Sequence, residues 1–192
     1  MGSHQIQAQE LQLAEALTRF ELVLVPGLND SSPEHWQSHW QRRFPAWRRV
    51  AQRNWNVADI DLWIDAIKRT LAQCQRPALL IGHSLGVLAI CALLEKPDHA
   101  RAVAGAMLVA PAEPAKFELE ERVPYRPLIV PSLVVASHDD PLMRFARAEF
   151  WAETWGSRLV DLGEARHINA EAGFGPWPYG LTLLSQLIAE LT

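Results

Sequence analysis

The sequence has few cysteines and no long hydrophobic run. Its two cysteines, Cys74 and Cys91, form neither a CxxC pair nor a disulfide framework, which argues against a disulfide-stabilised fold and against a zinc site. No stretch approaches the ~20 apolar residues of a membrane span, and the N-terminal residues lack the order of charged, apolar and small residues that marks a signal peptide. We therefore expect a cytoplasmic protein with no membrane partner and no bound metal.

An excess of positive charge is also missing. The 192 residues carry 18 Lys+Arg against 22 Asp+Glu, a formal net charge of -4, and the basic residues form no long run beyond the pairs at 42–43 and 48–49. A protein that binds nucleic acid presents a basic patch or stripe to the phosphates, so we expect no nucleic-acid partner. Hydrophobic residues make up 49% of the chain and charged residues 21%, which is typical of a soluble globular protein.

The length favours one domain, because 192 residues can bury one sizeable core and are few for two. We expect an N-terminal lead over residues 1–19 and a single domain over residues 20–192. Residues 1–4, with the sequence MGSH, resemble the remnant of an expression tag and carry no weight in the fold prediction. Residues 5–19 are polar and helical in pattern.

Short apolar strands alternate with amphipathic helices along the predicted domain. Strands are predicted at 20–25, 48–54 (a weak one), 78–81, 103–109, 132–137 and 158–162. Helices are predicted at 33–44, 59–71, 141–155 and 178–191, with one more directly after the third strand. Each crossover helix buries one side of a parallel sheet, so this alternation predicts an α/β fold of about six parallel strands with helices on both faces.

One pentapeptide carries the clearest chemical signal. Gly82-His83-Ser84-Leu85-Gly86 matches G-x-S-x-G, with a buried strand immediately before it and a helix immediately after it. In that context the serine stands on a sharp strand-to-helix turn, and the Leu85 amide at the helix N-terminus can stabilise an oxyanion. The alternative is a glycine-flanked serine that only caps a helix. The flanking strand and helix favour Ser84 as a nucleophile.

A serine nucleophile needs a histidine base and an acid that orients the base. In this fold class the acid and then the histidine follow the serine, each after a strand. The fifth predicted strand is followed by His138, Asp139 and Asp140, and the sixth by His167. A base at His138 would leave no strand end for the acid, so we favour His167. Either aspartate can then be the acid, although Asp140 with Pro141 behind it also suits a helix N-cap.

Four segments of the chain together resemble one family. They are Pro26-Gly27-Leu28-Asn29 with His35-Trp36, the G-x-S-x-G pentapeptide, residues 137–141 and residues 167–178. This combination resembles the small serine hydrolases related to retinoblastoma-binding protein 9, the YdeN-like family, over essentially residues 21–191. The resemblance implies a minimal α/β-hydrolase fold with an open site, no cap domain, no metal and no cofactor. It also implies Ser84 as nucleophile, Asp140 as acid and His167 as base.

The residues after the first strand can supply a second oxyanion donor beside the Leu85 amide. The first strand should lie next to the strand that carries Ser84, so the two strand ends should meet. We expect the Leu28 amide in this role, with Asn29 as the second choice. The alternative is a plain turn, which Pro-Gly and Asn-Asp favour in any case.

Asn29, His35 and Trp177 are candidates for contact with the substrate. His35 lines the site if the loop from Asn29 folds over it; its spacing from His39 also suits a metal site, but a polar helix face explains the pair better. Trp177 lies in the loop before the last helix, where it can wall the acyl pocket or anchor the loop. Arg166 departs from the family pattern, which usually has a glycine before the histidine.

These assignments predict acyl transfer to water by a carboxylesterase-like serine hydrolase. Ser84 forms an acyl-enzyme, His167 moves the proton and Asp140 holds the imidazolium. The expected partners are small carboxylic esters. Two alternatives stay open, namely a hydrolase of small amides or amino-terminal peptides, and a binding protein that keeps the fold without turnover.

Overall fold

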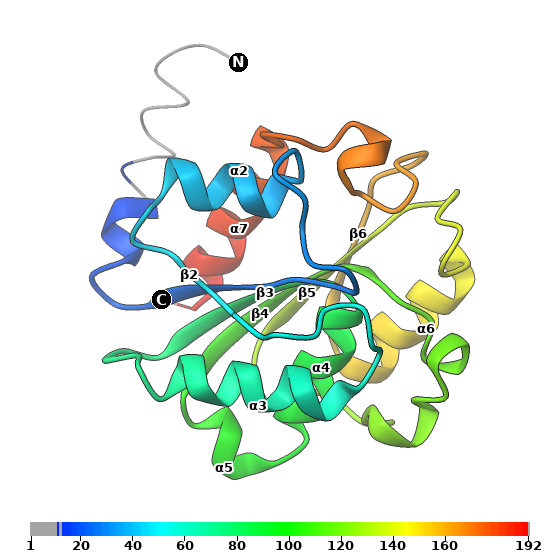
Figure 1. Cartoon of the computed structure of the whole chain (residues 1–192), viewed down its shortest axis with the longest axis horizontal. Coiled ribbons are helices and arrows are strands. Elements are labelled where there is room, and N and C mark those ends of the chain that lie inside the picture. The colour runs from blue at the N-terminus through cyan, green and yellow to red at the C-terminus, as the bar shows by residue number, and fades with distance from the viewer. Residues whose placement is uncertain (1–10, 12, 192) are drawn as a thin grey trace.

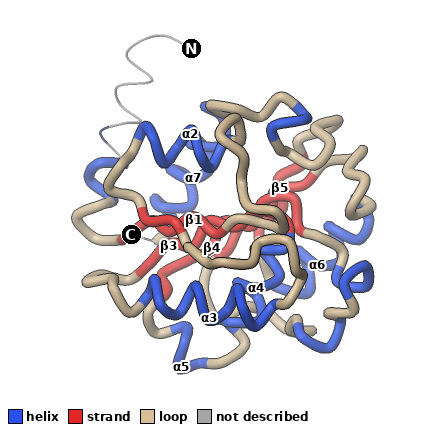
Figure 2. The backbone as a smooth tube through the Cα atoms, viewed as in Figure 1, coloured by secondary structure: helices blue, strands red, loops and turns tan. Residues whose placement is uncertain are grey.

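A parallel sheet of six strands forms the centre of the protein (Figures 1 and 2). The computed structural model describes residue 11 and residues 13–191. In chain order the strands are β1 (Glu21–Val25), β2 (Arg48–Arg49), β3 (Ala78–Ser84), β4 (Val103–Pro111), β5 (Ser132–Ala136) and β6 (Arg158–Asp161). Their spatial order is β2-β1-β3-β4-β5-β6, and every neighbouring pair is parallel. The predicted α/β class with six parallel strands is confirmed.

Helices cover both faces of this sheet, as Figure 1 shows. They are α2 (Trp36–Arg43), α3 (Ile60–Leu71), α4 (Leu85–Leu94), α5 (Pro97–Ala100), α6 (Phe145–Trp155) and α7 (Pro178–Glu190). Helices α2 and α7 lie on one face, and α3, α4 and α6 lie on the other. Each face has its own hydrophobic core, the first around Trp40 and Leu184 and the second around Trp63 and Trp151.

The elements at the centre of the molecule are buried on every side. All seven residues of β3 and all ten residues of α4 are buried. A helix that is apolar all round needs packing partners all round. The helix α4 has them, because it contacts α3, β3 and β4. Ser84, at the junction of β3 and α4, is therefore held between two buried elements.

Several boundaries differ from the prediction; the helix expected from residue 33, for example, begins at Trp36. The strand expected at 48–54 is reduced to the two residues of β2 that pair with β1. The helix expected from residue 141 begins four residues later, at Phe145, and its N-cap is Arg144. The expectation that Asp140 is suited to cap this helix is therefore wrong.

The N-terminal segment contributes to the core beneath α7. Residue 11 and residues 13–16 are helical, and the side chains of Leu13 and Ala16 are buried in the same core as Leu184. The remainder of the predicted lead, residues 1–10 and residue 12, lies outside the described residues, and so does the MGSH sequence.

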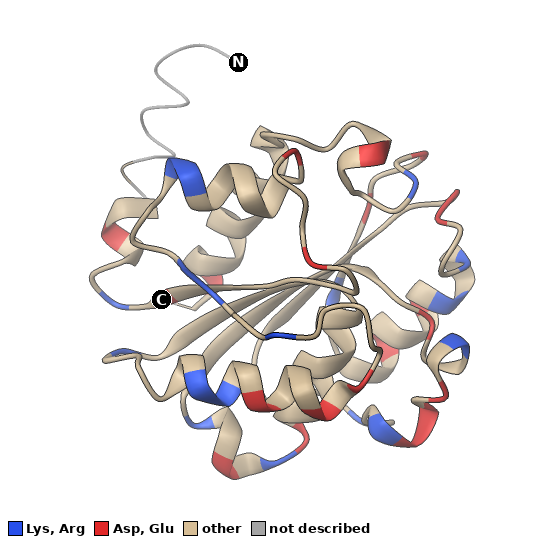
Figure 3. Ribbon diagram, viewed as in Figure 1, with Lys and Arg blue, Asp and Glu red and all other residues tan. Residues whose placement is uncertain are grey.

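The long connection between β4 and β5 contains two short 3-10 helices, η1 (Pro114–Phe117) and η2 (Glu120–Arg122). Within the described residues it forms no cap domain, as predicted. Charged residues of both signs are spread over the outer helices and loops (Figure 3). No helix in the described part of the chain is long and apolar enough to cross a membrane.

Candidate active site

The carboxyl ends of the strands meet at one edge of the sheet, where the predicted catalytic residues lie. Ser84 ends β3, Asp140 follows β5 and His167 follows β6. Ser84 and His167 line one cavity of about 630 Å³, and so do Leu28, Asn29 and His35. The fold therefore brings five of the predicted site residues to a single cavity.

Ser84 stands on a strained turn between β3 and α4. Its backbone has φ 55° and ψ -122°, a region that residues with a Cβ rarely adopt. The flanking glycines permit this turn. A Cβ on Gly82 would lie 2.6 Å from a side-chain atom of α4, and one on Gly86 would lie 2.5 Å from the carbonyl oxygens of Val25 and Pro26.

The loop after β1 lies directly against this turn. Val25 of β1 pairs with Gly82 of β3, and a Cβ on Gly27 would lie only 2.8 Å from the Cβ of Ser84. The backbone of the loop is therefore close to Ser84, as a donor to an oxyanion formed there would have to be.

Two amides of this loop differ in their availability. The Asn29 amide donates to the carbonyl of Trp55 at 2.7 Å, so it is already used. Among the described residues the Leu28 amide has no hydrogen-bond acceptor. The Leu85 amide begins α4, where the first amides of a helix have no partner within the helix. The geometry thus favours Leu28 over Asn29 as the second donor.

Polar side chains that are buried or partly buried hold the loop at residues 28–32. Arg49 binds the carboxylate of Asp30, and its guanidinium also donates to the carbonyl of Ser31 at 3.0 Å. The side-chain Nε2 of Gln37 donates to two carbonyls, one at the end of β1 at 3.2 Å and one in β3 at 3.1 Å. Gln37 also accepts from the hydroxyl of Ser31 at 2.6 Å. Sequence reasoning missed Arg49 and Gln37, because no local motif links them to this loop.

Asp140 contacts the histidine predicted to be the base. The Nδ1 atom of His167 lies 2.9 Å from Oδ2 of Asp140 and 3.1 Å from Oδ1, and both side chains are largely buried. An ionised carboxylate only accepts, so this contact assigns the ring proton to Nδ1 and leaves Nε2 free to take a proton. Within the described residues Ser84 and His167 are not hydrogen-bonded to each other; such bonds are often long in free enzymes and tighten on substrate binding.

Asp139, the alternative acid, points elsewhere. Its Oδ1 accepts from the amide of Arg166 at 2.7 Å. The hydrogen bond from the Arg166 amide is the main cause that holds the pKa of the Asp139 carboxyl below its usual value. The geometry therefore favours Asp140 as the partner of His167 and makes Asp139 an anchor for the backbone just before that histidine.

Two residues considered for the site lie outside the cavity. His138 is exposed, and its Nε2 lies 2.7 Å from the carboxylate of Asp161. Trp177 is 7% exposed, with its ring stacked on Trp40 at 5.7 Å and edge-on to Trp36 at 5.2 Å. As a correction to one of the two expectations, Trp177 packs in the core and anchors its loop rather than lining the acyl pocket.

His35 lines the cavity and caps α2. Its side chain is buried and does not form part of a polar helix face. Its Nδ1 accepts a hydrogen bond from the backbone amide of Gln37 at 3.2 Å. Burial, with smaller contributions from Arg49 and His167, lowers the pKa of His35 from 6.5 to about 3. In the part of the chain that the structure describes, no group of three His, Cys, Asp or Glu side chains is placed to hold a metal, including at His35 and His39.

Nine further residues line the cavity that sequence reasoning did not assign to it, and three of them come from other parts of the fold. His83 precedes the nucleophile, Phe117 comes from η1, and Leu142 follows Asp140 closely in the chain. Phe117 and Leu142, with Leu28, form most of the apolar part of the lining. No signal in the sequence marks Phe117, because the connection that carries it has no regular pattern.

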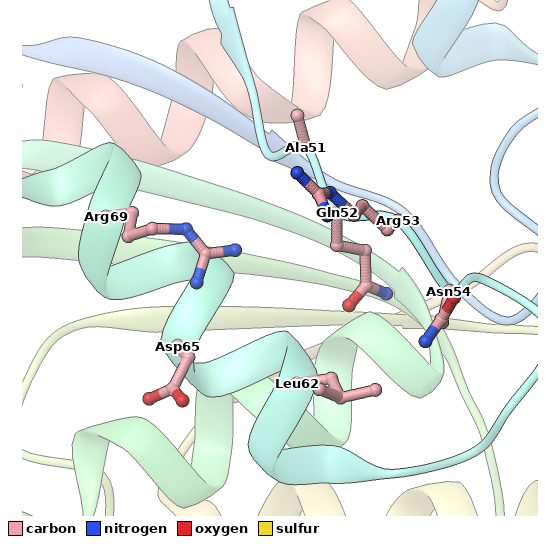
Figure 4. Close-up of a pocket in the computed structure, with 7 residues that line it drawn as sticks. All are labelled: Ala51, Gln52, Arg53, Asn54, Leu62, Asp65 and Arg69. Atoms are coloured by element: carbon pink, nitrogen blue, oxygen red, sulfur yellow. The ribbon is translucent and has the colours of Figure 1, made fainter.

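A second hollow, of about 580 Å³, lies between residues 51–54 and α3 (Figure 4). Gln52, Arg53 and Arg69 are among the residues that border it, and it shares no lining residue with the cavity at Ser84. It contains no serine, cysteine or histidine. The groups needed for acyl transfer therefore lie only in the first of these two cavities.

Comparisons with known proteins identify the family and the fold of the chain. The family model described as serine hydrolase matches residues 22–186. The chain belongs to this serine hydrolase family. A YdeN-like hydrolase from Pectobacterium atrosepticum is 54% identical to it, with 96% of this chain and 98% of that chain covered and a TM-score of 0.93. No curated protein sequence matches the chain.

More distant solved structures share the fold of this serine hydrolase. The ydeN gene product of Bacillus subtilis is 20% identical, with 89% of this chain and 99% of that chain covered and a TM-score of 0.71. A serine hydrolase homologue from Coxiella burnetii is 14% identical, with 91% and 86% covered and a TM-score of 0.62. The predicted minimal α/β-hydrolase fold and the resemblance to the YdeN-like family are thus confirmed.

The buried histidine at the start of α2 makes the stability of this serine hydrolase depend on pH. His35 is neutral in the folded protein down to about pH 3, whereas the unfolded chain protonates it near 6.5. The unfolded state therefore binds one proton more in this window, and the free energy of unfolding falls as the pH drops, by up to about 1.4 kcal/mol per pH unit. His35→Asn keeps a capping side chain and removes this titration. Urea unfolding between about pH 5 and 7.5 should show a smaller pH slope in the variant. Equal slopes in both proteins would contradict the assignment.

Proposed function

We propose that this serine hydrolase cleaves small carboxylic esters through an acyl-enzyme on Ser84. The contact between His167 and the buried carboxylate of Asp140, beside the cavity that holds Ser84, is the observation that carries the proposal. A serine hydroxyl is a weak nucleophile, and a histidine oriented by an acid is what activates it. The binding-protein alternative gives no reason to bury an Asp–His pair at such a cavity.

In the proposed reaction His167 takes the proton of Ser84 as the serine oxygen attacks the ester carbonyl. The amides of Leu28 and Leu85 stabilise the oxyanion of the tetrahedral intermediate, an effect of roughly 3 kcal/mol per donor. His167 then gives its proton to the departing alcohol, which leaves the acyl group on Ser84. Water repeats the sequence with His167 as base and releases the acid. Asp140 holds the imidazolium that forms in both halves.

Esters are proposed over amides on chemical grounds. An alcohol is a better leaving group than an amine, so the same three residues turn over an ester faster than an amide of equal size. Small amides and amino-terminal peptides remain the second substrate class, and parallel assays of chromogenic esters and aminoacyl amides separate the two.

The cytoplasmic location stays a prediction.

Covalent labelling tests the nucleophile directly. A fluorophosphonate probe should label the wild type on Ser84, and Ser84→Ala should lose both labelling and ester hydrolysis while it keeps its thermal unfolding temperature. Ser157→Ala, just before the amino end of β6 and away from the cavity, is the control; it loses the hydrogen bond with the Ser132 hydroxyl but should keep both labelling and ester hydrolysis. A wild type that is folded but not labelled would favour the binding-protein alternative. Labelling at another residue would refute the role of Ser84.

The two adjacent aspartates should respond differently to the same substitution. Asp140→Asn removes the charge that stabilises the imidazolium, so kcat should fall by up to about 10⁴. Asp139→Asn keeps an oxygen for the Arg166 amide, so it should cost much less. Steady-state kinetics on p-nitrophenyl acetate measures both. A large loss in Asp139→Asn with normal activity in Asp140→Asn would move the acid to Asp139.

The cavity should also limit the length of the acyl group. Its apolar lining is largely Leu28, Phe117 and Leu142, and within the described residues no cap domain extends it. A deep acyl tunnel would gain ~0.8 kcal/mol for each buried CH₂, and rates would climb with chain length. We expect kcat/KM for p-nitrophenyl esters to peak between acetate and butyrate. A peak at octanoate or longer would contradict this reading of the site.

A further inference from the structure

The loop that carries His167 has an uncommon backbone conformation. Arg166 and Ile168, on either side of the histidine, both have φ 48°. This is the left-handed region, which is sterically unfavourable for a residue with a Cβ. Such conformations persist when the surrounding structure imposes them. The contacts that hold this loop therefore determine where the imidazole of His167 stands.

Three consecutive carbonyls of the loop, those of residues 166, 167 and 168, each accept a hydrogen bond from a side chain elsewhere in the fold. The donors are, in that order, the hydroxyl of Ser137 at 2.5 Å, Nε2 of His83 at 2.9 Å and the indole nitrogen of Trp36 at 3.0 Å. They come from the end of β5, from β3 and from α2. Three different elements of the fold thus hold three consecutive peptide units of the loop.

The second of these bonds also leads to the nucleophile. His83 immediately precedes Ser84 in β3, and its side chain is buried. Its ring centre lies 4.8 Å from that of His167, and both rings line the same cavity. One side chain therefore ties the backbone of the proposed base to the backbone of the proposed nucleophile. The bonds from Ser137 and Trp36 make no such connection.

We propose that His83 is a positioning residue, whose Nε2–H holds the carbonyl of His167 and thereby sets the place of the imidazole relative to Ser84. The inference rests on the roles proposed for Ser84 and His167. A carbonyl only accepts, so the bond requires the proton of His83 on Nε2. Burial, and after it the neighbours His35 and His167, keeps the pKa of His83 well below its usual value. His83 therefore remains neutral and does not compete for the proton that His167 takes from Ser84.

Three substitutions of His83 separate the hydrogen bond from the volume of the ring. His83→Leu removes the donor, His83→Gln places an amide N–H near the position of Nε2, and His83→Asn carries an amide that is too short to reach it. A displacement of the base by ~1 Å can cost about 10²-fold, so kcat on p-nitrophenyl acetate should fall by that order in the Leu and Asn variants. His83→Gln should recover most of the loss. KM should change much less than kcat, and the rate of fluorophosphonate labelling should follow kcat.

The control is His138→Gln, the same substitution at an exposed histidine outside the cavity, which should leave the kinetics unchanged. Thermal unfolding identifies any variant that fails to fold. If His83→Leu is one of them, the comparison of Gln with Asn decides. Equal kcat in those two variants, or wild-type kcat in a folded His83→Leu, overturns the inference. A wild type that the probe does not label overturns the proposed function, and the inference with it.

Discussion

The contact between the end of β1 and the turn at Ser84 is the constraint on which the site depends. A Cβ on Gly86 would lie 2.5 Å from two carbonyl oxygens at the end of β1, and one on Gly27 would lie 2.8 Å from the Cβ of Ser84. Backbone therefore meets backbone here, with no side chain between. Because of that approach, the loop that starts at Leu28 and the N-terminus of α4 face the same point beside Ser84. The positions of Ser84 and of both proposed oxyanion donors thus depend on one packing contact.

The loops around this contact are fixed by hydrogen bonds from polar side chains as well as by apolar packing, such as that of Ile168. Loop backbone has no ladder of its own, so each buried amide and carbonyl needs a separate partner. Gln37 and Arg49 supply partners to the loop after β1, and Asp139 and His83 supply them to the loop of His167. A fully bonded polar network specifies a single arrangement, because a partly bonded one leaves buried groups unpaired. In this way a small fold without a cap domain can fix the positions of its proposed catalytic residues relative to one another.

The sequence predicted what local pattern determines. The strand, the G-x-S-x-G turn and the helix of Ser84 are contiguous, so their geometry could be inferred without knowledge of the rest of the fold. The choice between Asp139 and Asp140 could not be made from the sequence, because the two residues are adjacent and differ only in which distant group each contacts. The same holds for Trp177. From its place in the loop it could have formed a wall of the pocket, but its ring stacks on Trp40 in the core. Gln37 escaped notice for the same physical reason, since its bonds reach strand ends far away in the chain.

Arg166 shows how these bonds hold a backbone conformation that is more usual for glycine. A glycine before the histidine adopts a positive φ without steric penalty, whereas Arg166 does so at a cost of roughly 1–2 kcal/mol. The structure offsets this cost at both ends of the residue, because the amide of Arg166 donates to Asp139 and its carbonyl accepts from Ser137. Glycine would adopt this positive φ without steric penalty, whereas two hydrogen bonds hold Arg166 in it. The adjacent aspartates thus divide the work, with Asp140 directed to the imidazole of His167 and Asp139 to the backbone that presents it.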